Sequence, residues 1–341
     1  MGKRKTICIG IEGTAHTAGV GIVDSQCRVI ANEKHSHTTE KGGLIPAELA
    51  RHHREHFPGI IEAAIEKAKN RTAAGGAGIG WKDVDCIAYS MGPGIGSAMA
   101  VALENAKALS LEHGLPLVPV NHCIAHIEIA KKMCGVKDPL VLYVSGGNTQ
   151  VIGYDSGHYR VYGETLDIGI GNLLDSFGRE LGMGFPQGPK LDEAYFGNRK
   201  YVELPYSVKG MDLSFSGLFT AAKMKIGTEG IENADLAYSL MHNAFAMALE
   251  VTERALAHTG KKELLLTGGV AASKALQKMA LEMCDARGAK LKVCPQEFTT
   301  DNGAMVAWAG LLMFKAGRTV APEKAGTEQG FRVDSEEIDW I

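Results

Sequence analysis

Cysteine is scarce in this sequence, and its distribution argues against two kinds of stabilising framework. The 341 residues include seven cysteines, which are widely spaced and form no CxxC pair. An odd and scattered set of this kind disfavours both a disulfide scaffold and a cysteine-based zinc site.

Long apolar runs are also missing. No stretch reaches the roughly 18 uncharged residues that a membrane-spanning helix needs. The first five residues lead directly into a β-like segment, without the apolar region and cleavage site of a signal peptide. We therefore expect a cytoplasmic protein that does not associate with membranes.

The sequence has no large excess of charge of either sign. Its 36 Lys and Arg residues and 39 Asp and Glu residues give a net charge of -3, which disfavours a stand-alone nucleic-acid-binding protein but leaves room for a local basic patch or for helping partners. With 45% hydrophobic residues and roughly 100–200 residues per domain, the chain is long enough for two domains with separate cores.

Two regions share one pattern of strands and turns. Residues 7–31 and residues 140–162 each read as a strand, a Gly-rich turn, a strand, an Asp-Ser turn and a strand. A repeat at this distance indicates a duplicated domain and not a solenoid. Further strands are expected at Val84–Tyr89, Leu117–Val120, Glu263–Thr267 and Lys290–Val293, and helices at Pro46–Asn70 with a break at Pro58-Gly59, at Ser97–His113 from a Ser97 cap, and at Asp235–His258.

Alternating strands and helices predict an α/β fold with two lobes. We expect an N-terminal lobe over residues 1–134 and a C-terminal lobe over residues 135–320. An irregular insertion is expected around residues 185–225, and residues 321–341 read as a polar, peripheral tail.

A candidate metal site follows the strand Leu117–Val120. If the next segment is helical, His122 and His126 lie four residues apart on one helix face, as two imidazole ligands of a metal require. Two ordinary core or surface histidines are the alternative. Cys123 stands where a zinc peptidase has its general base, and Asp301 reads either as a third ligand or, on local grounds preferably, as a helix N-cap.

Three turns have the composition of phosphate-binding loops. They are Gly13-Thr14, Ser145–Thr149 and Gly268-Gly269, each after a predicted strand. No GxxxxGK[ST] sequence is present, and the Gly-rich segment Met91–Ser97 reads equally well as an anion site or as a tight connection. Asp175 and Asp192 flank a Gly/Pro loop, where they either accept hydrogen bonds from a ribose or substrate ammonium or are plain surface carboxylates.

Taken together, these motifs resemble one family. They are Gly10–Thr14, the His122/His126 pair, Tyr143–Thr149, Asp212–Gly217, Thr267–Ala271 and Asp301–Met305. In this order they resemble the universal TsaD family, and within it the shorter archaeal and eukaryotic branch, which is the catalytic subunit of the KEOPS complex and was formerly described as an O-sialoglycoprotein endopeptidase.

The resemblance implies a fold, a reaction and a set of site residues. The fold is a duplicated actin/Hsp70/sugar-kinase-like α/β fold (ASKHA) with nucleotide in the cleft. The reaction transfers threonylcarbamoyl from threonylcarbamoyl-AMP to the adenosine next to the anticodon of tRNA, and ATP, ADP or AMP can bind the same cleft. One divalent metal ion, iron or zinc, is implied at His122, His126, Tyr143 and Asp301, with Glu12 also counted among the catalytic residues. The implied nucleotide-binding residues are Tyr143, Val144, Ser145, Gly146, Gly147, Asp175, Gly188, Asp192 and Ser273, the last standing where the family usually has Asn.

The implied partners are tRNA and three KEOPS subunits: a Bud-type protein kinase, a small dimerisation subunit and a kinase regulator. Because this sequence ends at Ile341, we expect the kinase to be a separate chain. Candidate phosphate contacts are Arg51, His52, His53 and Arg54 with Lys3, Arg4 and Lys5, although the first four also read as a solvated helix face.

Three other functions fit parts of the pattern. A small-molecule kinase or ATPase, with Asp175 or Glu12 as base, explains the three turns but not the histidine pair. A metallopeptidase uses the histidines but lacks the base, and a nucleotide-gated scaffold would show no turnover.

Overall fold

Each half of the predicted repeat builds a five-stranded sheet of the same topology. The strand orders are β3-β2-β1-β4-β5 and β8-β7-β6-β11-β12. In both sheets the first three strands are antiparallel neighbours, and two further strands join in parallel. The duplicated α/β architecture predicted from the sequence is confirmed.

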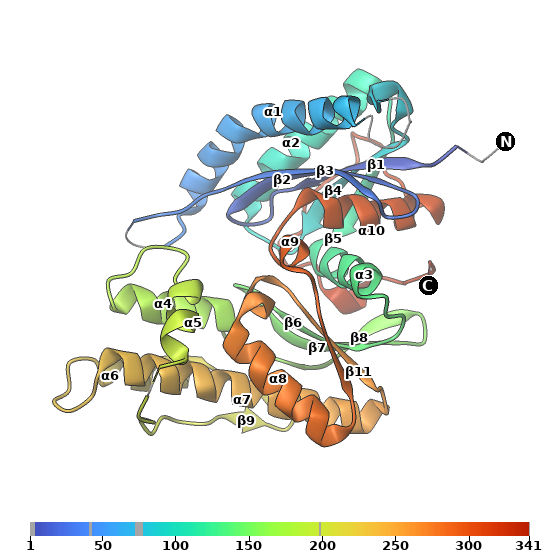
Figure 1. The fold of residues 1–341 in the computed structure, drawn as a ribbon. Coiled ribbons are helices and arrows are strands. Elements are labelled where there is room, and N and C mark those ends of the chain that lie inside the picture. The colour runs from blue at the N-terminus through green and yellow to red at the C-terminus, as the bar shows by residue number, and fades with distance from the viewer. Residues whose placement is uncertain (1–3, 41–42, 72–77, 198, 341) are drawn as a thin grey trace. The chain divides into compact units, whose positions relative to one another are not determined.

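The computed structural model describes residues 4–40, 43–71, 78–197 and 199–340 (Figure 1). Its strands are β1 (Ile7–Glu12), β2 (Thr17–Asp24), β3 (Val29–Ser36), β4 (Cys86–Gly92), β5 (Leu117–Asn121), β6 (Leu140–Val144), β7 (Thr149–Asp155), β8 (His158–Glu164), β9 (Val208–Lys209), β10 (Asp212–Leu213), β11 (Glu263–Thr267) and β12 (Lys290–Val293). Its α-helices are α1 (Pro46–Asn70), α2 (Gly96–His113), α3 (His122–Cys134), α4 (Ile170–Glu180), α5 (Gly188–Tyr195), α6 (Ser216–Met224), α7 (Asn233–Thr259), α8 (Lys274–Arg287), α9 (Gln296–Thr299) and α10 (Gly303–Lys315). The short 3-10 helices are η1 (Trp81–Asp83), η2 (Gly269–Ala272) and η3 (Val333–Ser335).

The chain divides into two units, and the first is made of three separate segments. It comprises Met1–His37, Leu44–Lys132 and Thr300–Ile341. The second comprises Thr38–Gly43 and Met133–Thr299. The C-terminal boundary therefore differs from the one expected from sequence, because α10 packs on the first sheet and not on the second.

Small residues let α10 lie directly on the first sheet. A Cβ at Gly303 would overlap the backbone nitrogen of Gly21 in β2, and a Cβ at Gly10 in β1 would overlap the nitrogen of Ala307. Real Cβ contacts are never this short, so only glycine permits the approach. This packing fixes the position of the residues that precede α10.

Helix α1 is continuous through Pro58-Gly59, where the sequence predicts a break. Pro58 is exposed, so its ring lies on the outer face of the helix. The opposite side of the helix carries apolar residues into the core on both sides of Pro58, including Phe57, Ile60 and Ala64. Tertiary packing therefore outweighs the local cost of an internal proline.

Two other local expectations were wrong. Helix α2 begins at Gly96 with Ile95 as its N-cap, while the Ser97 hydroxyl donates to the Pro46 carbonyl at 2.9 Å. The segment expected as an irregular insertion contributes α5, β9, β10 and α6 and buries Leu204, Phe215 and Leu218 in the core of the second unit.

The C-terminal tail is part of the first unit and is not peripheral. The Gly326 carbonyl accepts a hydrogen bond from the Tyr89 hydroxyl at 3.0 Å. Val333 and Ile338 are buried, and the amide of Asn121 donates to the carbonyls of Phe331 and Arg332 at 3.3 and 3.1 Å. The tail thus supports the junction between β5 and α3.

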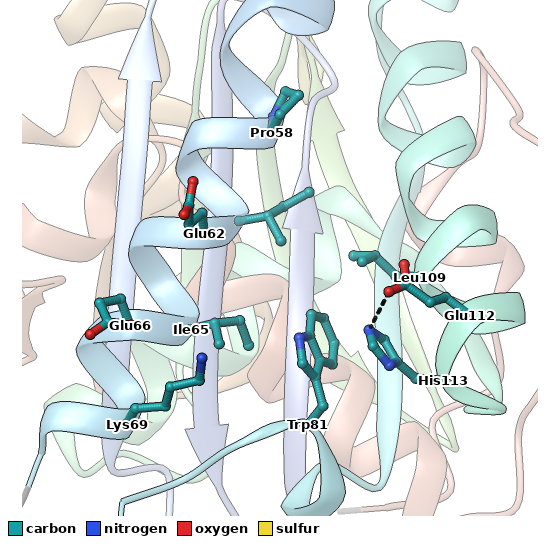
Figure 2. Close-up of a pocket in the computed structure, with 10 residues that line it drawn as sticks. Pro58, Glu62, Ile65, Glu66, Lys69, Trp81, Leu109, Glu112 and His113 are labelled. Carbon is teal, nitrogen blue, oxygen red and sulfur yellow. Dashed lines mark ion pairs between the residues drawn. The ribbon is translucent and has the colours of Figure 1, made fainter.

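A pocket of about 300 Å³ lies on the first unit between α1, α2 and η1 (Figure 2). The Trp81 indole stacks on the His113 imidazole with 4.0 Å between ring centroids, and Ile65 and Leu109 line the wall beside them.

Within the residues that the structure describes, no helix is both long and apolar enough to cross a membrane.

Candidate metal centre and nucleotide-binding residues

The histidine pair is presented by a capped helix end. The side-chain oxygen of Asn121 accepts hydrogen bonds from the backbone N–H groups of Cys123 and Ile124, at 2.9 and 3.2 Å. These bonds satisfy two of the donors at the start of α3. His122 is therefore fixed in the first turn, and His126 lies one turn further on the same face.

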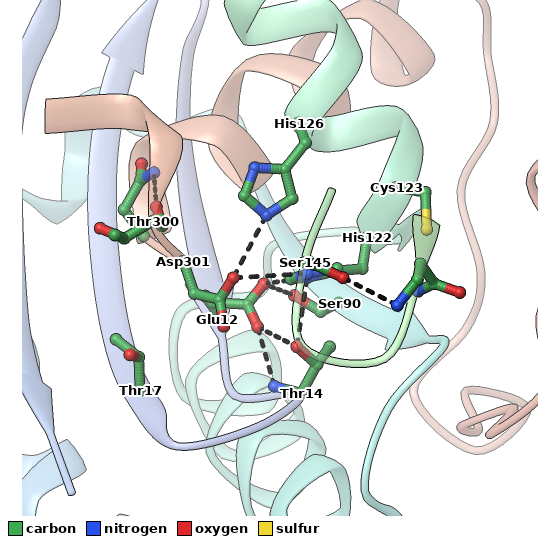
Figure 3. A network of polar contacts seen from close by, with 12 residues as sticks. Glu12, Thr14, Thr17, Ser90, His122, Cys123, His126, Ser145, Thr300 and Asp301 are labelled. Carbon is green, nitrogen blue, oxygen red and sulfur yellow. Dashed lines mark hydrogen bonds and ion pairs between the residues drawn. The ribbon is translucent and has the colours of Figure 1, made fainter. Parts of the chain in front are cut away.

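The structure brings His122, His126 and Asp301 together, as the resemblance implied (Figure 3). The Nε2 atom of His126 lies 3.2 Å from Oδ1 of Asp301, and Nε2 of His122 lies 3.5 Å from the same oxygen. One ligand atom from each of the three residues lies within 4.8 Å of the others. Two imidazoles and one carboxylate are a donor set that both iron(II) and zinc accept in proteins.

Glu12 orients His122 from the opposite side of the ring. Its Oε2 lies 3.0 Å from Nδ1 of His122 and accepts a hydrogen bond from Ser90 at 2.5 Å, while Oε1 accepts from the backbone and hydroxyl of Thr14 at 2.8 and 2.6 Å. Because Nδ1 faces this carboxylate, Nε2 is the nitrogen of His122 that faces Asp301, and a metal ion would bind there in place of the Nε2 proton. A second carboxylate behind a ligating histidine is typical of protein metal sites.

The electrostatics of the group favour a bound cation. Burial lowers the pKa of His122, but the Glu12 carboxylate, followed by Asp301, raises it to about 9. Burial lowers the pKa of His126 despite its contact with Asp301. Burial raises the pKa of Asp301, but the two imidazoles lower it by a larger amount. The net pKa lies below its usual value, so the carboxylate stays charged. Two carboxylates around two imidazoles thus call for at least one positive charge, which the proton on His122 supplies here and which a bound metal ion would supply in its place.

Asp301 is not the helix cap that its local sequence suggested. Asn302 caps α10, with its side-chain oxygen accepting from the Met305 N–H at 3.0 Å. The Asp301 carboxylate is consequently left to the histidines. Since Gly303 follows two residues later, the close packing of α10 on the sheet sets where Asp301 lies.

The donors of Thr14 in the Gly13-Thr14 turn are used inside the protein, and the predicted phosphate contact of this turn stays a prediction. The Thr14 backbone N–H and hydroxyl hold Glu12, and the Thr14 carbonyl accepts from the Ile95 N–H at 2.7 Å. A Cβ at Gly94 would lie 2.6 Å from the same carbonyl. The Gly-rich segment Met91–Ser97 is therefore a tight connection packed against this turn.

The Ser145–Gly147 turn belongs to the second unit and is held by the start of α4. The N–H groups of Gly171 and Asn172 donate to the carbonyls of Ser145 and Gly146, at 3.1 and 2.9 Å. Within the turn, Ser145 N–H donates to Asn148 O at 2.8 Å, and Asn148 N–H donates to the Ser145 hydroxyl at 3.1 Å. Among the hydrogen bonds of the described chain, none uses the N–H groups of Gly146 and Gly147, which are the donors that an anion would meet.

The other nucleotide-binding candidates of the second unit form two local groups. Asp192 accepts hydrogen bonds from the Ser273 hydroxyl at 2.5 Å and from the N–H groups of Lys274 and Ala275 at 2.9 and 3.2 Å. Ser273 also caps α8 by accepting from the Leu276 N–H at 3.2 Å. Both side chains thus have structural roles at the start of α8.

The second local group lies around Asp175. Its carboxylate accepts from the Gln187 N–H at 3.0 Å, directly before Gly188. Tyr143 and Val144 end β6 in this unit and are fully buried, and Gly268, with a φ of 92°, packs against the Val144 carbonyl. The assignment of Tyr143 as a metal ligand stays a prediction.

Asp167 is a polar anchor that the sequence analysis missed. Its carboxylate accepts from the Ser214 hydroxyl at 2.6 Å and from the N–H groups of Phe215 and Ser216, both at 2.9 Å. Burial raises the pKa of Asp167, but these hydrogen bonds lower it by a larger amount. The net pKa lies well below the usual range. Asp167 therefore ties the Asp212–Gly217 motif to the loop before α4, a link between distant segments that has no local sequence signal.

The predicted phosphate contacts on α1 are only partly accessible. Arg51 and Arg54 are exposed, but His52 and His53 are buried and cannot meet a phosphate. Lys5 contacts Asp24 and Gln26 at 3.2 and 2.6 Å, and Arg4 donates to the Asp83 carbonyl at 3.0 Å. Lys3 lies outside the described residues.

Comparison with known proteins identifies close relatives along the whole chain. A family model described as TsaD, tRNA N6-adenosine threonylcarbamoyltransferase, matches residues 27–308. A protein of Thermococcus sibiricus with that name is 51% identical over 334 residues, which cover 98% of this chain and 100% of the relative. A Methanosarcina mazei protein named probable bifunctional tRNA threonylcarbamoyladenosine biosynthesis protein is 48% identical over 338 residues, or 99% of this chain and 60% of the relative.

Solved structures of distant proteins share the fold. HypF of T. kodakarensis aligns with a TM-score of 0.60 at 16% identity, over 92% of this chain and 48% of that one. Component A of the Acidaminococcus fermentans (R)-2-hydroxyglutaryl-CoA dehydratase aligns with a TM-score of 0.56 at 16% identity, over 92% and 99%. These likenesses confirm the ASKHA-like fold, and at such identities they show nothing further.

Proposed function

The chain belongs to the TsaD family, and on that premise we propose how its residues carry out threonylcarbamoyl transfer to N6 of adenosine in tRNA. In the proposed reaction the adenosine amine bonds to the carbonyl carbon of threonylcarbamoyl-AMP. The bond from that carbon to the phosphate oxygen breaks, AMP leaves with the electron pair, and the amine nitrogen loses one proton. The donor is already activated, so positioning and charge stabilisation are what the protein must supply.

The observation that carries the proposal is the group formed by His122, His126 and Asp301. These residues suit one divalent metal ion, and the carboxylates of Asp301 and Glu12 supply the compensating negative charge. When bound, the ion polarises a carbonyl or phosphoryl oxygen. His122 and His126 hold their Nε2 atoms toward the same Asp301 oxygen, at 3.5 and 3.2 Å, which supports their role as ligands.

Glu12 acts as a positioning residue in this proposal. Its two oxygens already accept hydrogen bonds from Ser90 and Thr14 and face His122. A carboxylate engaged in this way is poorly suited to take a proton from water or substrate. The same observation disfavours a metallopeptidase or a kinase that would use Glu12 as its base.

The nucleotide part of the donor is proposed to bind the second unit. The N–H groups of Gly146 and Gly147 would receive its phosphate, because the other amides of the turn are used within it. Asp175 and Gly188 lie together at the start of α5, and Asp192 with Ser273 lies at the start of α8. These two groups are the proposed acceptors for ribose hydroxyls.

The names of the relatives support tRNA as the acceptor substrate and a KEOPS-type context. We propose that a Bud-type kinase, a small dimerisation subunit and a kinase regulator assist this chain in the cytoplasm. Its near-neutral charge, -3 overall, fits a protein that shares tRNA binding with partners.

The test is transfer from labelled threonylcarbamoyl-AMP to unmodified tRNA, with and without the partner subunits, followed by mass spectrometry of the nucleosides. We expect threonylcarbamoyladenosine from the wild type and from His258→Gln, which changes an exposed histidine of α7, and none from His126→Ala. Metal content measured on the same samples would give the identity of the ion. Product from folded, metal-free His126→Ala would remove the metal from the mechanism, and no product from metal-loaded wild type with partners would overturn the function.

A further inference from the structure

A second group of histidines lies on the first unit, apart from His122 and His126. It joins the end of β3 to one face of α1. The Nδ1 atom of His35 lies 2.7 Å from Nε2 of His52, and the rings of His35 and His56 stack with 3.7 Å between centroids. The centroids of the His52 and His56 rings are 4.5 Å apart.

The three histidines have the spacing of a metal site. His52 and His56 are four residues apart on α1, so their rings project from one helix face. His35 reaches them from the neighbouring strand. One ring nitrogen of each residue lies within 4.8 Å of the other two. Nitrogens that each bind a zinc ion at roughly 2.0 Å are roughly 3.3 Å apart in a tetrahedral site, so small ring rotations suffice.

Accessibility and charge state both suit metal binding. His52 is buried, His56 is partly buried and His35 is exposed, so one side of the group is open to an ion and to water ligands. Burial, followed by the nearby imidazoles of His53, His56 and His35, lowers the pKa of His52 to about 3. Its lone pairs are thus not blocked by protonation at neutral pH, as metal binding requires.

The surrounding polar groups support the same conclusion. His52 Nδ1 lies 3.1 Å from Nδ1 of His53, so this contact helps to hold the orientation of the His52 ring. His53 is fully buried, and its Nε2 has no hydrogen-bond partner in the described structure. His37 lies beside His52, with 5.5 Å between ring centroids, and faces Glu48 at 3.9 Å. The contacts of His35, His52 and His56 described here are thus with other imidazoles, and a set of nitrogen donors of this kind suits a transition-metal ion.

We propose that His35, His52 and His56 bind one divalent transition-metal ion, in a site separate from His122, His126 and Asp301. Three imidazoles favour zinc, nickel or copper over magnesium or calcium, which prefer oxygen ligands. The bound ion would join the edge strand β3 to α1. The proposal goes beyond the transferase function and does not depend on it.

The experiment is a zinc titration of the chelator-stripped full chain against a competing chelator, in five proteins. They are the wild type, His56→Gln, His126→Ala, the double variant and His258→Gln, the last as the control for adventitious binding to an exposed histidine. We expect His126→Ala to keep one equivalent of zinc and the double variant to bind at least tenfold more weakly. Because His56 is only partly buried, its replacement by Gln should leave the fold intact, which circular dichroism checks.

A second readout identifies the ligands directly. In the His126→Ala background, Cu²⁺ bound at the proposed site should show nitrogen hyperfine coupling in its electron paramagnetic resonance spectrum, and His35→Gln should weaken it. Equal zinc affinity of His126→Ala with and without the His56 change would overturn the proposal, as would a copper spectrum unchanged by His35→Gln. Neither result touches the transfer reaction, whose own test depends on His126.

Discussion

The Oε2 atom of Glu12 lies 3.0 Å from Nδ1 of His122, and both side chains are buried. The contact joins residues 110 positions apart, one at the end of β1 and the other at the start of α3. It directs the remaining nitrogen of His122 toward Asp301. Much of the ordering of the metal group therefore depends on a residue that does not contact the metal position.

We expect Glu12→Gln to weaken metal binding by about 10-fold to 100-fold while the protein stays folded, since loss of a carboxylate behind a ligating histidine has effects of this size. The measurement is a metal titration against a competing chelator. Glu128→Gln is the matched control, because Glu128 is also buried and lies on α3 but pairs with Lys131 at 3.2 Å. Equal losses in the two variants would contradict a specific role for Glu12.

Asn121→Ala should lower the free energy of unfolding by about 1 to 2 kcal/mol, as loss of a helix N-cap usually does. The change also removes the hydrogen bonds to the carbonyls of Phe331 and Arg332. Chemical denaturation measures the loss. Asn105→Ala provides the comparison, because the Asn105 amide donates to the Val101 carbonyl within α2 and does not cap the helix start, and its effect should be smaller.

Gly303→Ala should destabilise the protein by about 2 to 4 kcal/mol, because the added methyl overlaps the backbone of Gly21 and neither strand nor helix can yield freely. The shift of α10 should also reduce metal affinity, since Asp301 moves with it. Gly326→Ala is the control, because a Cβ there has no atom within 4 Å. A stable Gly303→Ala protein with unchanged metal binding would refute the proposed coupling between packing and the site.

The C-terminal tail should make stability depend on pH. Burial raises the pKa of Glu336 to about 7, although Arg318 at 3.5 Å opposes the effect and Asp339 adds to it. The folded protein therefore binds this proton more tightly than the unfolded chain, and stability falls as pH rises from about 4.5 to 7. We expect Glu336→Gln to remove this slope and to be more stable than the wild type at pH 8, by on the order of 1 to 3 kcal/mol.

Unfolding measured at several pH values tests this expectation, with the exposed neighbour change Glu337→Gln as control. A wild-type slope that persists in Glu336→Gln, or that disappears equally in Glu337→Gln, would assign the effect to other groups.

The sequence predicted what depends on local periodicity and on motif order. The two strand meanders, the helical spacing of His122 and His126 and the family were all correct, because each leaves a pattern within a short window. The break at Pro58 and the Ser97 cap were wrong, because both follow local propensity, which packing overrides.

Long-range features left no such pattern. Nothing local brings Asp301 beside His126, and on local grounds a helix cap was the better reading. The roles of Asp167 and Glu12 depend on contacts between distant segments, as does the attachment of the tail. The burial of His52 and its contact with His35 likewise required the fold, so the sequence suggested phosphate contacts where the structure has a histidine cluster.

The three-segment make-up of the first unit has a consequence for biosynthesis. Residues 133–299 are translated before Thr300–Ile341, so the second unit can fold on the ribosome while the first still lacks α10 and its tail. Its metal group then has both histidines but no Asp301. The site is completed only when nearly the whole chain has been made, so a protein truncated before Thr300 would lack one of the three ligand candidates and should bind the metal ion more weakly.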